Sequence, residues 1–178
     1  MFFMDAAHFV FAPFLGYLWC FVRLFIKAPS GRKRFNVLGA LDAITHEMIT
    51  ITNTGYINSY SVCQLLIKLS DKYCDFPISI VLDNARYQKC KLVQNTAKLL
   101  NIELLFLPPY SPNLNLIERM WKFVKKKCLY SKYYSDFEAF SNSILQCLAE
   151  TSGGYKKELD SLLALNFQSF SKSQIMTV

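Results

Sequence analysis

Short apolar runs that end at turn residues fill the first third of the chain. Met1–Met4 stops at Asp5, and Phe35–Leu41 and Met48–Thr52 each lie between residues of turn character such as glycine, serine and asparagine. Runs of β-branched and aromatic residues bounded in this way are typical of strands. The pattern therefore predicts three or four antiparallel strands at the start of the domain.

Phe9–Ile26 is the one apolar stretch whose length approaches that of a membrane span. Pro13, Gly16 and Arg23 interrupt it, whereas a spanning helix needs a continuous apolar run with few or no charges. A signal peptide would need a positively charged start and a small-residue cleavage site, and neither is present. We expect a strand, a turn around the proline and glycine, and a second strand at Leu18–Ile26. We predict no membrane partner, with a membrane anchor as the alternative.

Helical periodicity begins near residue 60, where Val62, Leu65, Leu66, Leu69 and Tyr73 lie at the spacing of one helix face. Helices and strands then alternate, which predicts an α/β domain with a mixed sheet and flanking helices. The later predicted elements are strands at Ile78–Leu82 and Ile102–Leu107, helices at Leu92–Leu100 and Ile117–Cys128, a helix that starts from a capping box at Ser135 and includes Leu148, and a last helix at Lys156–Leu165.

Three acidic residues lie where apolar elements begin or end. Asp5 and Asp83 each follow an apolar run that predicts a buried strand, and Glu118 lies in the first turn of a helix for which Asn115 is the expected N-cap. A carboxylate at a strand end and one at a helix start can meet in the crevice at the edge of an α/β sheet. Three such acids repel one another unless a cation compensates them, so the pattern predicts a site for a divalent metal with oxygen ligands.

Each acid also has a purely structural interpretation. Glu118, three positions after Asn115, satisfies the capping-box pattern, and an acid in the first turn stabilises any helix through its dipole. Asp83 followed by Asn84 is equally consistent with an ordinary turn after a strand. It is the combination of three acids that favours a metal site.

Other residues near the acids are expected to be structural. His8 follows Asp5 by three positions, so on a strand it points to the opposite face. His46, beside a turn, is expected to be solvated. Trp121 shares the core face of its helix with Ile117 and is expected to pack there.

The residues around two of the acids form a long motif. The sequences LDNA (residues 82–85) and LPPYSPNLNLIER (residues 107–119) place 34 residues between Asp83 and Glu118. Together with Asp5, this pattern resembles the acidic triad of the DDE transposases, and more narrowly the bacterial insertion-sequence branch of the mariner-like superfamily. The resemblance runs from about Met1 to about Tyr134.

Three positions depart from the pattern that is common in this family. Leu116 stands where many members have proline, Ala6 stands after the first acid where many have glutamate, and Gln88 stands where many have histidine. None of these differences removes a carboxylate of the triad. They therefore concern the tuning of the site more than its chemistry.

The resemblance implies an RNase H-like fold, which is also the fold expected from the order of the predicted elements. It further implies a metal-dependent DDE-type transposase and endonuclease, in which Asp5, Asp83 and Glu118 are the catalytic residues and hold two Mg²⁺ ions, with Mn²⁺ as a substitute. The implied reactions are hydrolysis of DNA at the ends of an insertion sequence and transfer of the freed 3′ hydroxyl to target DNA.

Basic residues outnumber acidic residues by 20 to 13, and the net charge of +7 favours a polyanionic partner. A generic basic surface is the alternative, but the charges are clustered, and one cluster follows the third acid, where a DNA backbone would pass. For Asn84 a turn role is an equal alternative, and for Arg119 a solvated charge. The residues predicted to bind DNA are Arg32, Lys33, Arg34, Asn84, Arg86, Arg119, Lys122, Lys125 and Lys126.

The six cysteines include no Cys-x-x-Cys pair and no metal-binding spacing with histidine. The sequence therefore predicts neither a zinc site nor a disulfide framework, which is typical of a reducing cytosol. Together with the resemblance, this predicts a cytoplasmic, nucleoid-associated bacterial protein.

The predicted domains are a catalytic core at residues 1–134 and a C-terminal helical extension at residues 135–178, with a tail that frays from Gln168. Met1 lies almost on the first predicted strand, so we expect the family's N-terminal helix-turn-helix domain to be absent and to be supplied by a separate chain or reading frame. The expected partners are DNA, as transposon ends and target, and a second copy of the chain in a homodimer. The alternatives are a catalytically silent or truncated DNA-binding remnant and another RNase H-like nuclease.

Overall fold

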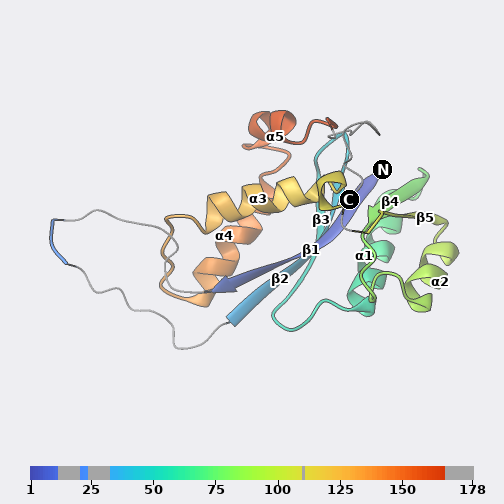
Figure 1. The fold of residues 1–178 in the computed structure, drawn as a ribbon, viewed down its shortest axis with the longest axis horizontal. Coiled ribbons are helices and arrows are strands. Elements are labelled where there is room, and N and C mark those ends of the chain that lie inside the picture. The colour runs from blue at the N-terminus through green and yellow to red at the C-terminus, as the bar shows by residue number, and fades with distance from the viewer. Residues whose placement is uncertain (12–20, 24–32, 110, 167–178) are drawn as a thin grey trace, which may run out of the picture.

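A five-stranded mixed sheet in the order β3-β2-β1-β4-β5 is the centre of the computed structural model, which describes residues 1–11, 21–23, 33–109 and 111–166 (Figure 1). β1 (Phe2–Phe11), β2 (Lys33–Asp42) and β3 (Met48–Asn53) form an antiparallel meander. β4 (Ile78–Leu82) runs parallel to β1, and β5 (Ile102–Phe106) runs parallel to β4. The predicted α/β fold with a mixed sheet is confirmed.

Helices cover both faces of this sheet (Figure 1). α1 (Ser59–Lys72) and α2 (Lys91–Leu99) pack on one face, while α3 (Ile117–Cys128), α4 (Phe137–Ala149) and α5 (Lys156–Leu162) belong to the layer on the other. Successive side chains of β1 point to opposite faces of the sheet, so Met4 packs with α1 whereas Phe3 and Phe9 pack with α3. β1 is therefore buried on both sides.

The apolar stretch at residues 9–26 is described only in part. Its first residues complete β1, as the predicted first strand requires. Of the predicted second strand, Leu18–Ile26, only residues 21–23 are described, and they are not in a strand. The rest of that strand and the predicted turn at Pro13 and Gly16 lie outside the described residues. Within the described part of the chain, no helix is long and apolar enough to cross a membrane.

The start of α4 differs from its predicted cap by one residue. The N-cap of α4 is Asp136 rather than Ser135, because the Asp136 carboxylate accepts the backbone N–H of Ala139 at 2.8 Å. The N-cap of α1 is Asn58, which forms a capping box with Ser61. An ionised acceptor is a stronger cap than a hydroxyl, which accounts for the shift of one residue in α4.

The start of α3 is the difference that bears on function. Pro112–Leu114 forms a 3-10 turn that leads directly into the helix, so the N-cap is Leu116, with helical backbone and no side-chain cap. The expectation that Asn115 caps the helix is wrong. Its side chain turns inward, and Nδ2 donates to the carbonyl of Met4 at 3.4 Å. The first turn is closed by backbone alone, since Glu118 N donates to Asn115 O at 3.1 Å.

The C-terminal helices share a core with α3. Phe140 and Ile144 of α4 and Leu159 of α5 lie in the same hydrophobic cluster as Trp121 and Phe3. Side chains on both sides of the predicted boundary at residue 134 thus contribute to one cluster, and the boundary itself stays a prediction. α5 ends three residues before the predicted helix end, and the predicted frayed tail lies outside the described residues.

Candidate active site

The register between β1 and β4 brings the first two acids to the same level. Phe3 pairs with Val81 in the parallel ladder, so two residues further along Asp5 stands level with Asp83 and on the same face of the sheet. The expectation that Asp5 ends its strand is wrong, because β1 continues along β2, with Asp5 opposite Gly39. It is β4 that ends, and its end opens a crevice beside β1.

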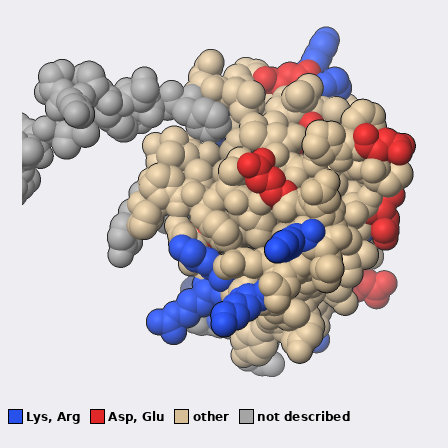
Figure 2. Space-filling view, turned by 90° about the vertical axis from the view of Figure 1, so that its right-hand side faces the viewer, with Lys and Arg blue, Asp and Glu red and all other residues tan. Residues whose placement is uncertain are grey.

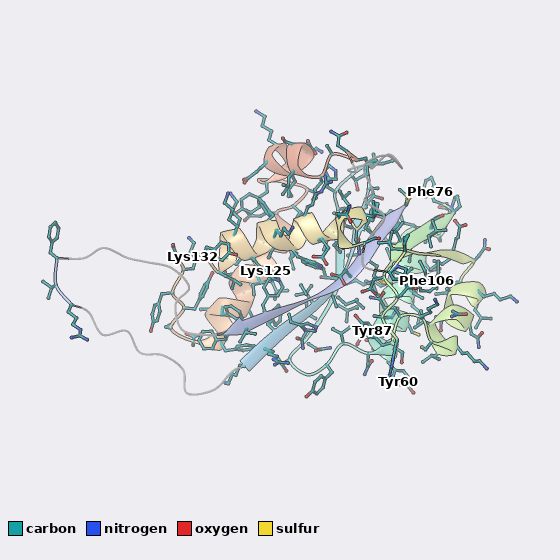
Figure 3. All side chains as sticks on the ribbon, in the orientation of Figure 1. Tyr60, Phe76, Tyr87, Phe106, Lys125 and Lys132 are labelled. Atoms are coloured by element: carbon teal, nitrogen blue, oxygen red, sulfur yellow. The ribbon has the colours of Figure 1, made fainter. Side chains whose placement is uncertain are left out.

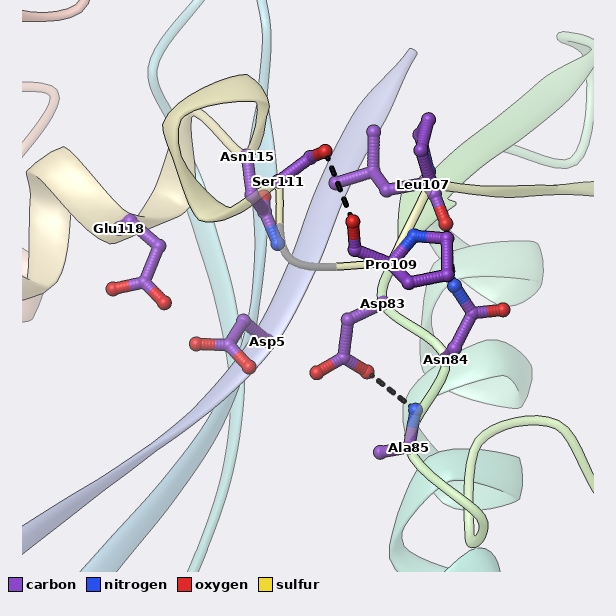
Figure 4. Close-up of a pocket in the computed structure, with 10 residues that line it drawn as sticks. Asp5, Asp83, Asn84, Ala85, Leu107, Pro109, Ser111, Asn115 and Glu118 are labelled. Carbon is purple, nitrogen blue, oxygen red and sulfur yellow. Dashed lines mark hydrogen bonds between the residues drawn. The ribbon is translucent and has the colours of Figure 1, made fainter. Parts of the chain in front are cut away.

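Asp5, Asp83 and Glu118 line one pocket of about 370 Å³, and their carboxylates face one another across it (Figure 4). One comes from the body of β1, one from the loop after β4 and one from the first turn of α3. Three acids that are far apart in the sequence are therefore brought together. The other lining residues are Asn84, Ala85, Leu107, Pro108, Pro109, Ser111 and Asn115.

Asp5 is the most strongly perturbed of the three acids. Burial raises its pKa to about 7, and the negative charges of Glu118 and Asp83 act in the same direction. Two hydrogen bonds lower this pKa in part, one from the backbone of Ala6 and one from Trp121, whose Nε1 donates to Oδ2 at 3.1 Å. Sequence reasoning assigned Trp121 to packing and missed this contact, although its position three residues after Glu118 places both on one side of the helix.

Asp83 is held by donors from its own loop. The backbone N–H of Ala85 donates to Oδ1 at 3.0 Å. Gln88 is fully buried, and in the amide orientation that satisfies both of its ends its nitrogen donates to the same oxygen at 2.5 Å. Asn84 points elsewhere: its amide donates to the carbonyl of Leu107 and accepts from Lys89 at 3.2 Å. Asn84 thus joins the end of β4 to the end of β5, which is a structural role.

The pocket fits hard divalent cations. Its charged groups are all carboxylates, and none of the described residues that line it is basic. The negative charge of the three acids therefore lacks a protein counter-charge in the described lining of the pocket. Within the described ranges, no three His, Cys, Asp or Glu side chains stand close enough to hold one ion together. The fit is therefore to ions that take one or two carboxylates each and complete their shells with water and substrate oxygens, as Mg²⁺ does.

The predicted DNA-binding residues on α3 fall into two groups. Lys122 and Lys126 are exposed, and Lys125 is half-buried towards the C-terminal half of the helix (Figure 3). Arg119 instead donates to the carbonyl oxygens of Leu162, Ala164 and Asn166 at 3.4, 2.8 and 2.9 Å. Arg119 therefore fixes the chain that follows α5.

The other predicted DNA-binding residues lie away from the acids. Lys33 begins β2 six residues before Gly39, the partner of Asp5, which at about 3.3 Å per residue places it about 20 Å along the sheet. Its neighbour Arg34 is also exposed, and Arg32 lies outside the described residues. Arg86 is exposed in the loop after β4. On the face at the side of β4 and β5, most of the visible Lys and Arg side chains lie in the lower half, and others lie at the top beside acidic side chains (Figure 2).

The two histidines have structural partners. His8 faces the side of the sheet opposite Asp5, as predicted, and its Nδ1 lies 2.7 Å from Asn36 Oδ1. His46 is buried, and its Nδ1 lies 3.0 Å from Asp160 Oδ1 of α5. The expectation that His46 is solvated is wrong, because α5 packs against the turn between β2 and β3.

A mixed sheet with flanking helices and a carboxylate-lined crevice beside its central strand is the arrangement of an RNase H-like fold. Residues 1–141 match the family model described as DDE superfamily endonuclease, and the chain belongs to this family. The predicted DDE-type transposase and endonuclease family is thereby confirmed, as is the RNase H-like fold.

Solved structures with the same fold include a transposase and a retroviral integrase. The Mos1 transposase, in a paired-end complex with the left transposon end, is 16% identical with a TM-score of 0.60, over 94% of this chain and 56% of its own. The HTLV-2 integrase catalytic core, in complex with magnesium, is 13% identical with a TM-score of 0.55, over 84% of this chain and 83% of its own.

A curated relative matches a shorter stretch. The uncharacterized protein y4pE/y4sA of Sinorhizobium fredii (strain NBRC 101917 / NGR234) is 42% identical over 38 residues, which are 21% of this chain and 28% of that protein. The chain spans about half the length of the Mos1 transposase that it resembles.

Proposed function

We propose that this chain is the catalytic domain of an insertion-sequence transposase that cuts and joins DNA strands with two divalent metal ions. The observation that carries the proposal is the pocket in which Asp5, Asp83 and Glu118 face one another without a basic counter-charge among its described lining. Membership of the DDE endonuclease family supports the same activity. The reactions would be hydrolysis at the element's ends and attack of the freed 3′ hydroxyl on target DNA.

The three carboxylates would hold the ions between them. Asp5 lies between the other two acids, with Asp83 beside it across the sheet and Glu118 above it on α3 (Figure 4), so it is placed to share both ions. When bound, a pair of Mg²⁺ or Mn²⁺ ions stabilises the attacking and leaving oxygens of an in-line displacement at phosphorus. Two similar structures, the Mos1 mariner paired-end complex with Mn and the HTLV-2 integrase catalytic core in complex with magnesium, support this choice of metals.

The protein's own task is to keep three carboxylates in place without neutralising them. The donors to Asp83 are a backbone amide and the amide of Gln88, and the side-chain donor to Asp5 is an indole. Neutral donors fix the oxygens while leaving the negative charge for a cation, whereas a lysine or arginine would compete with it. Asp5 must also lose its proton before it can bind metal.

The DNA would run from the pocket along α3. Glu118, Lys122 and Lys125 follow one another at intervals of four and three residues, which places the lysines on the side of the helix that carries the acid. We include Lys126 and Arg86 as exposed cations close to this path. Lys33 and Arg34 would contact the duplex about 20 Å from the cut, or roughly six base pairs.

The partners proposed are DNA and a second copy of the chain. Structures similar to this one are named for a paired-end complex with a transposon end and for a viral intasome, which supports DNA and a multimer as partners. The proposed location is the bacterial cytoplasm, at the nucleoid.

Nicking of supercoiled plasmid tests the activity. The purified chain should nick with Mg²⁺ or Mn²⁺ and not with Ca²⁺, and Asp83→Asn and Glu118→Gln should each abolish nicking. Glu103→Gln is the matched control, because Glu103 is exposed on β5 and bonds Ser79 outside the pocket. Nicking that survives both pocket substitutions would refute the assignment, and DNA binding without any nicking would favour the silent remnant.

A further inference from the structure

The indole of Trp121 is held in one place by its surroundings. Trp121 is 2% exposed, and its ring meets the ring of Phe9 edge to face, with centroids 6.4 Å apart and planes at 81°. From this position Nε1 donates to Oδ2 of Asp5 at 3.1 Å. A buried indole N–H usually finds an acceptor, but here the acceptor is the carboxylate of the proposed metal site.

Gly39 supplies the space that lets the indole reach Asp5. It lies in β2 directly opposite Asp5. A Cβ atom at Gly39 would stand 2.8 Å from Cη2 of Trp121 and 2.6 Å from Cε of Met48. Both distances are shorter than real contacts of a Cβ atom, so a side chain at Gly39 would displace the ring. A glycine inside a strand is typical of such a close approach.

The same helix therefore acts on two of the acids. α3 carries Glu118 in its first turn, and one turn later it donates from Trp121 to Asp5. Just before the helix, Asn115 bonds the carbonyl of Met4, the residue before Asp5. Both bonds join chain segments more than 110 residues apart, and both fix β1 relative to α3 at Asp5.

We propose that Trp121 is a positioning residue that holds Oδ2 of Asp5 and leaves Oδ1 for the metal, with Gly39 as the space that makes this possible. The inference rests on the proposed function, since it gives the indole a role towards the metal ions. A neutral donor orients the carboxylate while its charge is kept. Loss of a bond of this kind to a metal ligand typically weakens metal binding by about 10-fold to 100-fold.

Binding of Mn²⁺ to the full chain without DNA tests the proposal, with free Mn²⁺ measured by electron paramagnetic resonance. Trp121→Phe, which keeps an aromatic ring but lacks the N–H, should weaken Mn²⁺ binding by about 10-fold or more. Gly39→Ala should weaken it as well, because it displaces the ring. Phe123→Leu is the matched control: Phe123 is a buried aromatic of the same helix and cluster, and its substitution should leave the affinity unchanged.

A double-mutant cycle separates positioning from folding. In an Asp5→Asn background, Trp121→Phe should cause no further loss of Mn²⁺ affinity, because the carboxylate that it orients is gone. Replacement of Trp121 by benzothienylalanine, which substitutes sulfur for N–H in a ring of nearly the same shape, gives the same test if the phenylalanine variant does not fold.

The outcomes separate this inference from the proposed function. Mn²⁺ binding that falls with Asp5→Asn but stays within twofold of wild type with both the phenylalanine and the benzothienyl variants would overturn the positioning role alone. Mn²⁺ binding that is unaffected by Asp5→Asn would overturn the proposed metal site itself, and the positioning role with it. Additive losses in the cycle would show that Trp121 acts only through packing.

Discussion

The protonation of Asp5 links the site to the stability of the metal-free protein. Its pKa is raised from 3.8 to about 7, so the folded state binds a proton that the unfolded state has released between these values. Stability from this group is therefore complete below the unfolded pKa and is lost as pH rises through about 7.

We predict that metal-free protein loses about 1 kcal/mol of unfolding free energy at this group between about pH 6 and pH 8. Chemical denaturation at the two pH values measures the loss. Asp5→Asn removes the titrating group, so the variant should lack this part of the pH dependence. An identical pH dependence in wild type and variant would show that the carboxyl titrates normally.

The same proton competes with metal. Because a carboxylate must be ionised to bind a cation, the affinity for Mn²⁺ should rise about tenfold between about pH 6 and pH 8, with release of roughly one proton per chain at about pH 6 and little release at about pH 8. Calorimetric titration in two buffers of different ionisation enthalpy measures both quantities. A constant affinity over this range would contradict the raised pKa of Asp5.

At the scale of elements, α3 organises the site and the surface around it. Its buried side packs on β1 and β2, its first turn carries Glu118, and its exposed side carries Lys122 and Lys126. Arg119 lies next to the acid, yet it bonds the backbone after α5. We therefore expect neighbouring cations on this helix to have different tasks, with Arg119 serving structure and Lys122 and Lys126 serving DNA binding.

Substitution of these cations should separate the tasks. Arg119→Ala should lower stability by about 1 to 3 kcal/mol, because it removes charge-assisted hydrogen bonds to three carbonyls. Lys122→Ala should leave stability unchanged, weaken DNA binding, and reduce the slope of log affinity against log salt by about one. Thermal unfolding and salt-dependent DNA binding are the two measurements. Equal effects of both substitutions on DNA binding alone would contradict this division.

The spacing of apolar residues was sufficient to predict most helices and strands, because the residues that recur at that spacing are the ones that pack in the core. Val62, Leu65, Leu66 and Leu69 are all fully buried in α1, as their spacing predicts. The start of α3 could not be predicted, because the choice between capping and long-range bonding by Asn115 depends on β1 standing beside it. A capping pattern describes local options only.

The three acids that line the candidate site could be predicted from the sequence, but the residues that hold these acids in place could not. Asp5, Asp83 and Glu118 stand out as carboxylates bordering apolar elements, and the family motif marks them. Trp121 was predicted to be a core residue, and it is buried. Its hydrogen bond to Asp5, however, depends on how α3 lies over β1. Periodicity along one helix carries no information about that placement.

At the scale of the whole molecule, the layer that holds Glu118 in place extends to the C-terminal helices. Leu148, Leu159 and Leu163 are buried in the cluster that contains Trp121, and Lys127 of α3 pairs with Glu158 of α5 at 2.8 Å. Removing α4 and α5 would expose the apolar side of α3. We therefore expect the pocket lined by the three acids to depend on chain beyond the predicted boundary at residue 134.

A chain truncated after Tyr134 should lose cooperative unfolding and Mn²⁺ binding together, because the exposed cluster no longer stabilises α3. A chain truncated after Asn166 retains all three helices and is the matched control. Calorimetric unfolding and Mn²⁺ titration of both chains test this. A cooperative, metal-binding fragment of residues 1–134 would show that the core ends where the sequence predicted.

The most direct test of the central claim is the anomalous scattering of Mn²⁺ in crystals of the protein grown with the metal. We predict Mn²⁺ within about 2 Å of carboxylate oxygens of Asp5 and Asp83, with a second ion reaching Glu118 when a DNA end is present. Mn²⁺ bound elsewhere, with the pocket free of metal at saturating concentration, would contradict the account.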